Sequence, residues 1–279
     1  MSKVELKVLV DNNTIIDRYY LGEPAVSYLI KDGTHKVLFD VGYSDIFIKN
    51  AQQMGETLVD IDYVVISHGH NDHTGGLLPL TKLLESQGNG HKPTLIAHPE
   101  AFNHKEYESE SIGATLSREE LAKHFDLKLS REPVWVTENM LFLGEIARSN
   151  DFENTEPVGK CECSGALIND FVKDDSALAI KLPDGIAIVT GCSHAGICNI
   201  IDQAKTLIDE DRVIDVIGGF HLIEPTEHQA VGTLEYFTQQ NIDVIHPCHC
   251  TSLKYKIALA KHSKVEDVGV GLHLNWAAV

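Results

Sequence analysis

The order of apolar and polar residues along the chain predicts an α/β protein. Alternating or continuous apolar runs predict strands at residues 4–10, 25–30, 36–39, 61–67, 94–97, 134–136, 140–143, 177–182, 186–190, 213–217, 242–245 and 268–274. Apolar residues three and four apart predict helices at residues 46–54, 77–84, 117–125, 197–208, 225–237 and 252–262. Each half begins with a hairpin and then alternates strand and helix, and no linker rich in Pro, Gly or Ser divides them. We therefore expect residues 1–279 to form a single domain.

Two segments interrupt this pattern. Residues 99–117 are polar and lack a clear period. Such an insertion often lies over an active site as a lid, and the alternative is a surface loop without a function. Residues 144–175 form the longest stretch without periodicity, which inside a compact domain indicates function or mobility.

The composition is that of a globular protein with a strong negative charge. The 279 residues are 43% hydrophobic, enough for a substantial core, and the net charge is −18. Nucleic acids and anionic membranes both require a basic face, so neither is expected as the main partner. A small phosphorylated substrate stays compatible with this charge, because bound divalent cations reverse the local field.

The expected location is the cytoplasm. The N-terminus has no signal-peptide core, and no run of about 18 apolar residues predicts a membrane span. Without a signal sequence, the six cysteines are not expected to form a disulfide framework.

The most informative stretch is residues 68–73, His-Gly-His-Asn-Asp-His, which follows a predicted buried strand. Ordinary turns favour Gly, Asn, Asp and Ser over three histidines. Imidazole and carboxylate are ligands of divalent metals, and side chains at this spacing leave a tight turn in different directions, so one loop can serve two neighbouring ions. The sequence therefore predicts a metal site. Its predicted ligands are His68, His70, Asp72 and His73.

Histidines also follow other predicted strands. Strands ending near residues 190, 218 and 246 deliver His194, His221 and the pair His246 and His249. Loops at the carboxyl ends of strands converge on one rim of an α/β fold. We therefore expect these histidines to approach the 68–73 turn.

These motifs carry a resemblance to a known family. His-x-His-x-Asp-His, with residues 38–42 (Leu-Phe-Asp-Val-Gly) one strand earlier, resembles the metallo-β-lactamase-fold hydrolases. A closer resemblance, over nearly the whole chain, is to the branch named for 7,8-dihydropterin-6-methyl-4-(β-D-ribofuranosyl)aminobenzene-5′-phosphate synthase. The motifs that carry it are residues 67–77, Asp174-Asp175, 190–196 (Thr-Gly-Cys-Ser-His-Ala-Gly), 218–222 (Gly-Gly-Phe-His-Leu) and 247–251 (Pro-Cys-His-Cys-Thr). The chain departs from the branch at Ser252, where Gly is usual.

The resemblance implies a four-layer αββα sandwich, the metallo-β-lactamase fold. It also implies two divalent metal ions, with zinc expected and iron or manganese as alternatives, and His194 and His249 as further ligands. Four residues are expected either as additional ligands or as partners that orient the ligands. These are Asp40, Asp175, Cys192 and His246.

Cys192 lies where the superfamily normally supplies an Asp that bridges the two ions. A thiolate ligates zinc or iron but bridges hard cations poorly. Either Cys192 is a ligand and the metal is soft, or the second ion is weakly held. Asp175 is the candidate for supplying the missing oxygen.

The expected activity is hydrolysis or group transfer on a small phosphorylated substrate, of pterin type if the resemblance extends that far. A pair of ions lowers the pKa of a bound water to about 7 and clamps a phosphate oxygen. Asp72 is expected to take up the released proton or to bind the second ion, and His221 is the other catalytic candidate, with ligation or substrate contact left open. By resemblance, the named reaction joins a dihydropterin methyl diphosphate to a ribofuranosyl aminobenzene phosphate and releases pyrophosphate.

Two other classes of function stay open. Six cysteines close to histidines also suit an iron-centred redox or sensing protein. A metal-stabilised binding module without turnover is the third alternative.

Overall fold

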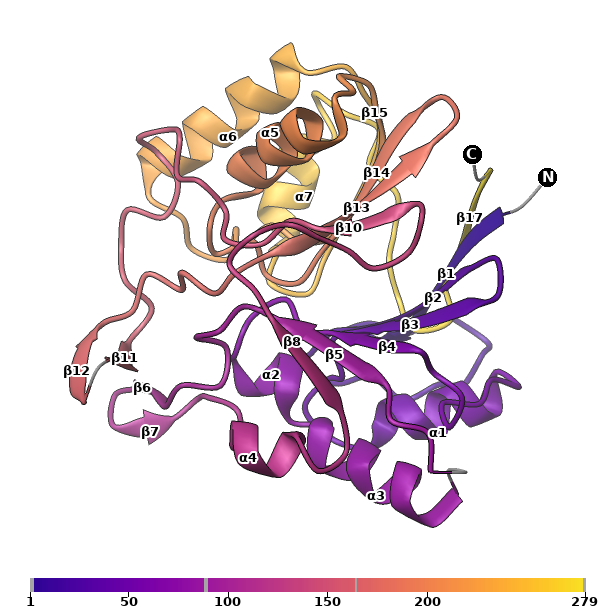
Figure 1. The fold of residues 1–279 in the computed structure, drawn as a ribbon. Helices are drawn as coiled ribbons and strands as arrows, with labels where there is room; N and C mark the ends of the chain where they lie inside the picture. The colour runs from indigo at the N-terminus through magenta and orange to yellow at the C-terminus, as the bar shows by residue number, and fades with distance from the viewer. Residues whose placement is uncertain (1–2, 88–89, 164, 278–279) are drawn as a thin grey trace.

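The computed structural model describes residues 3–87, 90–163 and 165–277, and two large sheets dominate it (Figure 1). The first sheet has seven strands in the order β17-β1-β2-β3-β4-β5-β8. They are β1 (Lys3–Val10), β2 (Ser27–Asp32), β3 (His35–Phe39), β4 (Tyr63–Val65), β5 (Thr94–Ala97), β8 (Asp126–Leu129) and β17 (His273–Ala277). The second sheet has six strands in the order β16-β15-β14-β13-β10-β9. They are β9 (Val134–Trp135), β10 (Met140–Phe142), β13 (Ala177–Leu182), β14 (Gly185–Thr190), β15 (Val213–Gly219) and β16 (Ile242–Cys248).

Helices cover the outer face of each sheet. The seven-stranded sheet packs against α1 (Ile46–Gln53) and α3 (Leu77–Gln87), and the six-stranded sheet against α5 (Ile197–Ile208), α6 (Glu227–Gln239) and α7 (Leu253–Leu259) (Figure 1). A third apolar cluster fills the space between the sheets, with Leu6, Tyr28 and Phe39 on one side and Met140, Phe142 and Ile180 on the other. The expected four-layer αββα sandwich is confirmed.

The direction of the strands decides where the loops meet. β3, β4, β5 and β8 run parallel, and so do β14, β15 and β16. Parallel strands place all their carboxyl ends along one edge of a sheet. The segments after β3, β4, β14, β15 and β16 therefore leave from two corresponding edges, and these segments carry the predicted ligands.

The ends of some predicted helices and strands agree with the structure, and others differ. The helix predicted at residues 117–125 begins with a capping box: the Ser117 hydroxyl accepts a hydrogen bond from the Glu120 amide, and the Glu120 carboxylate accepts one from the Ser117 amide, at the start of α4 (Arg118–Leu121). In contrast, α4 ends at Leu121, four residues before the expected end at residue 125, and β8 (Asp126–Leu129) was not predicted from the sequence. Strand β16 runs to Cys248, three residues beyond the end expected from the sequence at residue 245.

The two irregular segments pair with each other in a small four-stranded sheet, β12-β11-β6-β7, which projects to the left in Figure 1. Its strands are β6 (Lys105–Tyr107), β7 (Glu110–Ser111), β11 (Lys160–Cys163) and β12 (Ala166–Asn169). β6 and β11 are joined through Cys161 opposite Lys105. These strands are only two to four residues long, and the pairing of β6 with β11 that joins the two hairpins spans more than fifty positions, so no local pattern predicts the sheet.

None of the helices in the described ranges is long and apolar enough to cross a membrane.

Candidate metal centre

The turn after β4 brings the first four predicted ligands together. His68, His70 and His73 are buried, and the Asp72 side chain is 28% exposed. The turn lies directly on the loop after β5, because a Cβ on Gly69 would lie 2.0 Å from the carbonyl oxygen of Ala101. Only glycine is compatible with this close approach.

One group of imidazoles consists of His68, His70 and His194. Potential ligand atoms of His68 lie within 4.8 Å of those of Cys192 and His194 in one cluster, and of those of His70 and Asp72 in another. The ring centroids of His68 and His70 are 4.6 Å apart, and each ring lies 4.8 Å from His194. Three buried ring nitrogens here, Nε2 of His70 and both nitrogens of His194, have no hydrogen-bond partner among the described residues. Buried polar atoms are normally satisfied, so these nitrogens are suited to a bound cation.

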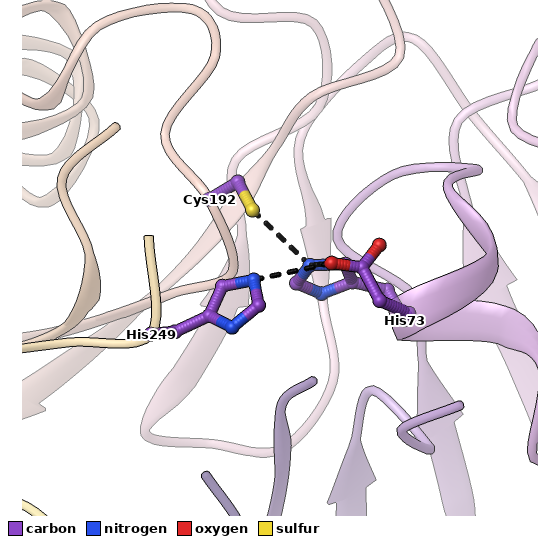
Figure 2. A group of neighbouring side chains, drawn as sticks. His73, Cys192 and His249 are labelled. Carbon is purple, nitrogen blue, oxygen red and sulfur yellow. Dashed lines mark hydrogen bonds and ion pairs between the residues drawn. The ribbon is translucent and has the colours of Figure 1, made fainter. Parts of the chain in front are cut away.

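A second group joins Asp72, His73, Cys192 and His249. The Cys192 thiol lies 3.2 Å from His73 Nε2, and the Asp72 carboxylate lies 3.2 Å from His249 Nε2. Figure 2 shows the three labelled side chains of this group pointing toward one another from separate segments. Potential ligand atoms of all four residues lie within 4.8 Å of one another, and Cys192 has the same relation to His68 and His194. The Cys192 sulfur is therefore shared by both groups.

Neighbouring side chains orient these imidazoles. His73 Nδ1 lies 2.6 Å from Asp40, whose carboxylate also accepts hydrogen bonds from the amide and hydroxyl of Ser67. His249 Nδ1 lies 3.0 Å from the side-chain oxygen of Asn12. In both cases the contact at Nδ1 leaves Nε2 directed into the second group, which is the usual arrangement of metal-bound histidines.

Several of these residues adopt strained backbone conformations. Asp40, Ser193, His221 and His249 all have positive φ, at 53°, 59°, 49° and 48°. A left-handed conformation costs on the order of 1 kcal/mol for a non-glycine residue, and such residues gather at functional sites. All four follow strands at the edge where the ligand-bearing loops meet.

The acidic pair at 174–175 supports the ligands from behind. The Asp175 carboxylate accepts a hydrogen bond from the Ala195 amide, and its other oxygen lies 3.9 Å from His68 Nδ1 without a partner among the described residues. Asp174 accepts from the Gly69 amide and from the buried Lys105 ammonium. Neither carboxylate belongs to a ligand group, and the supply of the missing oxygen by Asp175 stays a prediction.

His246 and His221 lie in different surroundings. Because β16 continues through Cys248, His246 is inside the strand, and its Nδ1 contacts Asp215 at 2.8 Å, outside both ligand groups. His221 does reach the site: its ring lies 4.2 Å from that of His194, and its Nδ1 has no partner among the described residues.

Asn12 and Lys105 are site-supporting residues that the sequence patterns did not reveal. The position of Asn12 just beyond β1 is a usable signal, since it lies at a strand end like the ligands. Lys105 had no such signal, because it is a lone lysine in a polar segment.

The histidines of the two ligand groups differ in their pKa values. Burial lowers the pKa of His68, and burial together with Lys105 lowers the pKa of His70 to about 4. Burial also opposes the charge of His73, but Asp72 and Asp40 outweigh it and raise the pKa of His73 to about 9. Burial also lowers the pKa of His194, so at neutral pH the first group is uncharged, whereas His73 is protonated on both ring nitrogens and positively charged.

This difference predicts two distinct pH dependences for zinc binding. An ion at the second group must displace the His73 proton, so its affinity should rise by about tenfold per pH unit until the pH approaches about 9. The imidazoles of the first group should add little pH dependence above about pH 5, because His70 is already deprotonated there. Displacement of the Cys192 thiol proton would add to the slopes of both ions, so the slope at the second group stays the steeper one. Competition with a chelator across this pH range measures both affinities, and equal slopes for the two ions would contradict the assignment.

A cavity of about 760 Å³ opens over both groups. Its floor includes His70, Asp72, Cys192 and His249, and its walls include Tyr43, Tyr107, Ile112 and Val158. The last three come from the two segments that lack a clear pattern in the sequence. Those segments therefore line the space above the ligands, whereas the opening and closing of a lid stays a prediction.

The chain is similar to known proteins along most of its length. The family description "Metallo-beta-lactamase superfamily" matches residues 21–249. Uncharacterized protein MJ0448 of Methanocaldococcus jannaschii is 32% identical over 267 residues, 95% of this chain and 96% of that protein. A second protein of that organism, 7,8-dihydropterin-6-methyl-4-(β-D-ribofuranosyl)-aminobenzene-5′-phosphate synthase, is 28% identical, with 91% and 90% covered.

A solved structure is also similar to this chain along most of its length. The crystal structure of Tm1679, described as a metal-dependent hydrolase of the β-lactamase superfamily, has a TM-score of 0.83 and 29% identity, with 97% of this chain and 98% of that chain covered. The fold is therefore that of a superfamily of metal-dependent hydrolases and related enzymes, which normally bind divalent metals, and the candidate ligand groups agree with this. The chain belongs to the metallo-β-lactamase superfamily.

Proposed function

We propose that this protein is a metal-dependent hydrolase or transferase acting on a small phosphorylated substrate of pterin type. The observation that supports this most strongly is the convergence of two ligand groups, with Cys192 common to both, on the floor of one cavity. Two adjacent groups of donors are what a two-ion site requires.

The residues suit divalent ions, with zinc as the proposed metal. His68, His70 and His194, whose rings lie together, would hold one ion, and Asp72, His73 and His249 the other, with Cys192 beside both. Imidazole, carboxylate and thiol are the ligands that zinc prefers, and the unpartnered nitrogens of His70 and His194 are available. When bound, the ions supply an acidified water and a clamp for phosphate or diphosphate oxygens.

The cavity walls support a substrate with a flat, weakly polar part. Tyr43 and Tyr107 remain 57% and 52% exposed at the cavity, and Ile112 and Val158 lie with them. Among the described residues lining this cavity there is no lysine or arginine. Metal ions held by the ligand groups would therefore neutralise a phosphate bound in this cavity. The tyrosine rings could stack on a heterocycle.

Asp72 and His221 are the proposed catalytic residues. Asp72 lies between the two groups and is close enough to accept a proton released at the floor of the cavity. His221 lines the cavity beside His194, where its unpartnered Nδ1 can hold or donate a proton to a leaving group.

The pterin-type substrate is supported by the synthase of Methanocaldococcus jannaschii, to which the chain is similar along most of its length. The test is to incubate zinc-loaded protein with a dihydropterin methyl diphosphate and 4-(β-D-ribofuranosyl)aminobenzene 5′-phosphate. Pyrophosphate release that is abolished by a chelator and restored by zinc is expected. If no metal-dependent pyrophosphate appears, the synthase reaction is excluded; phosphoester hydrolysis in a parallel panel would then favour the hydrolase.

A second candidate is an iron-centred redox or sensing protein on the same fold. It is favoured by one observation, the soft thiol of Cys192 shared by both groups. Protein isolated without added metal would then carry iron and show a visible spectrum that responds to reductant. Elemental analysis of such protein distinguishes the two candidates.

Replacing Cys192 by Asp is expected to shift metal preference. The thiol lies within ligand distance of both groups, so a carboxylate there should lower the preference for zinc over manganese by at least about tenfold. Competition binding of the two metals measures this. Cys198→Ala is the control, because Cys198 is equally buried but lies on α5 outside the ligand groups. Unchanged metal content and preference in Cys192→Asp would rule out Cys192 as a ligand.

A further inference from the structure

A second cavity of about 850 Å³ adjoins the cavity above the ligands. The two share Asn12, Ile223 and His249, so His249 and the residue that orients it stand at their junction. The second cavity continues between the segment after β1 and the start of α7. A hydrolase that uses water needs only one substrate cavity, whereas a transferase needs two that meet at the reacting atoms.

The second cavity differs from the first in its chemistry. Among the described residues lining either cavity, Lys256 is the single lysine or arginine. Its ammonium makes no hydrogen bond or ion pair with the described residues. Most of the surrounding polar groups are neutral, including Asn13, Thr14 and Ser252, and Asp267 is the one carboxylate. In a chain of net charge −18, the unpaired Lys256 ammonium is therefore suited to bind an anionic group of a ligand.

The remaining walls are apolar. Ile15, Ile16, Leu253 and Val268 line the cavity, and the Ile16 and Leu253 side chains are 83% and 71% exposed. Such walls cover an uncharged ring or sugar face, while Lys256 contacts the charged end. The combination suits a molecule with an aromatic body and a phosphate, the phosphate lying in the second cavity, which Lys256 lines.

We propose that this second cavity is the acceptor-substrate site of a transferase, in which Lys256 binds the phosphate of an aryl acceptor. This rests on the proposed function and selects transfer over hydrolysis. In the transfer, the acceptor nitrogen bonds to the methylene carbon of the donor as the carbon–oxygen bond to diphosphate breaks. The diphosphate leaves with the electron pair, and the nitrogen loses its proton to solvent.

The test is equilibrium binding without turnover, so that it is independent of the reaction. The probes are 4-(β-D-ribofuranosyl)aminobenzene 5′-phosphate and its dephosphorylated form, titrated calorimetrically into zinc-loaded and zinc-free protein with no donor present. Wild-type protein should bind the phosphorylated probe about tenfold more tightly than the dephosphorylated one, with or without zinc, because the phosphate contacts Lys256 rather than the ions.

Variants of opposite charge provide the control. Lys256→Gln should remove the preference for the phosphorylated probe, and Asp267→Asn should increase it. Lys254→Gln should leave it unchanged, because Lys254 is an exposed lysine of the same helix outside the cavity. A preference that survives in Lys256→Gln, disappears on removal of zinc, or is absent from the wild type would overturn this site. Failure of the proposed function would instead appear as absent metal-dependent turnover, with the binding preference intact.

Discussion

Replacing His68 by Gln should remove at least one of the two bound ions and lower metal-dependent turnover by at least about a thousandfold. His68 is buried, contacts His70 at 3.0 Å, and is grouped with potential ligand atoms of Asp72, Cys192 and His194. Loss of a residue that merely orients a ligand costs about 10- to 100-fold, and loss of a ligand common to several groups should cost more. Elemental analysis and a phosphoester or pyrophosphate-release assay measure the two effects.

The matched control for this variant is His98→Gln. His98 is also fully buried, but it contacts Glu145 and lies outside the ligand groups. It should retain both ions and keep turnover within about tenfold of the wild type. Equal losses in both variants would show that His68 acts through folding alone, and two ions retained in His68→Gln would exclude it as a ligand.

The second large effect is on stability. Replacing Lys105 by Met should lower the free energy of unfolding by about 3–5 kcal/mol, because two buried carboxylates would lose their cation. The ammonium lies 2.7 Å from Asp170 and 2.8 Å from Asp174, and all three side chains are buried. Asp174 also accepts from the Gly69 amide, so the metal-binding turn should loosen as well.

Urea unfolding measures the loss. Lys160→Met is the control, since Lys160 is an exposed lysine in the same small sheet and should change stability by no more than about 0.5 kcal/mol. Adding Asp174→Asn to Lys105→Met removes one of the two stranded charges, so this double variant should regain part of the lost stability. If the Lys105 and Lys160 variants unfold at the same urea concentration, the buried network has no stabilising role.

The sequence predicts the layers of this protein because its core strands and helices have strong periodic patterns. α5, for example, buries Ile197, Ile200, Ile201, Ala204 and Ile208 on one face, as the spacing requires. The small sheet could not be predicted, since strands of two to four residues have no period to detect and are stabilised by distant partners. The true end of β16 was missed for a similar reason: its last residues are held by pairing with β15, which only the tertiary fold provides.

The candidate site was predictable to the extent that it lies at strand ends. His194, His221 and His249 follow β14, β15 and β16 and reach the turn that holds His68. His246 was expected there as well, but inside β16 its side chain turns to Asp215. The roles of Asn12 and Lys105 depend on hydrogen bonds across more than sixty residues of sequence, and spacing carries no information on such contacts.

We propose that loops from both halves of the chain hold two ions side by side. Anomalous scattering at the zinc edge from crystals of zinc-loaded protein tests it directly. Two peaks are predicted, one bounded by His68, His70 and His194 and the other by Asp72, His73 and His249, with the Cys192 sulfur next to both. Absence of peaks between these side chains, or zinc bound only elsewhere on the surface, would contradict the account.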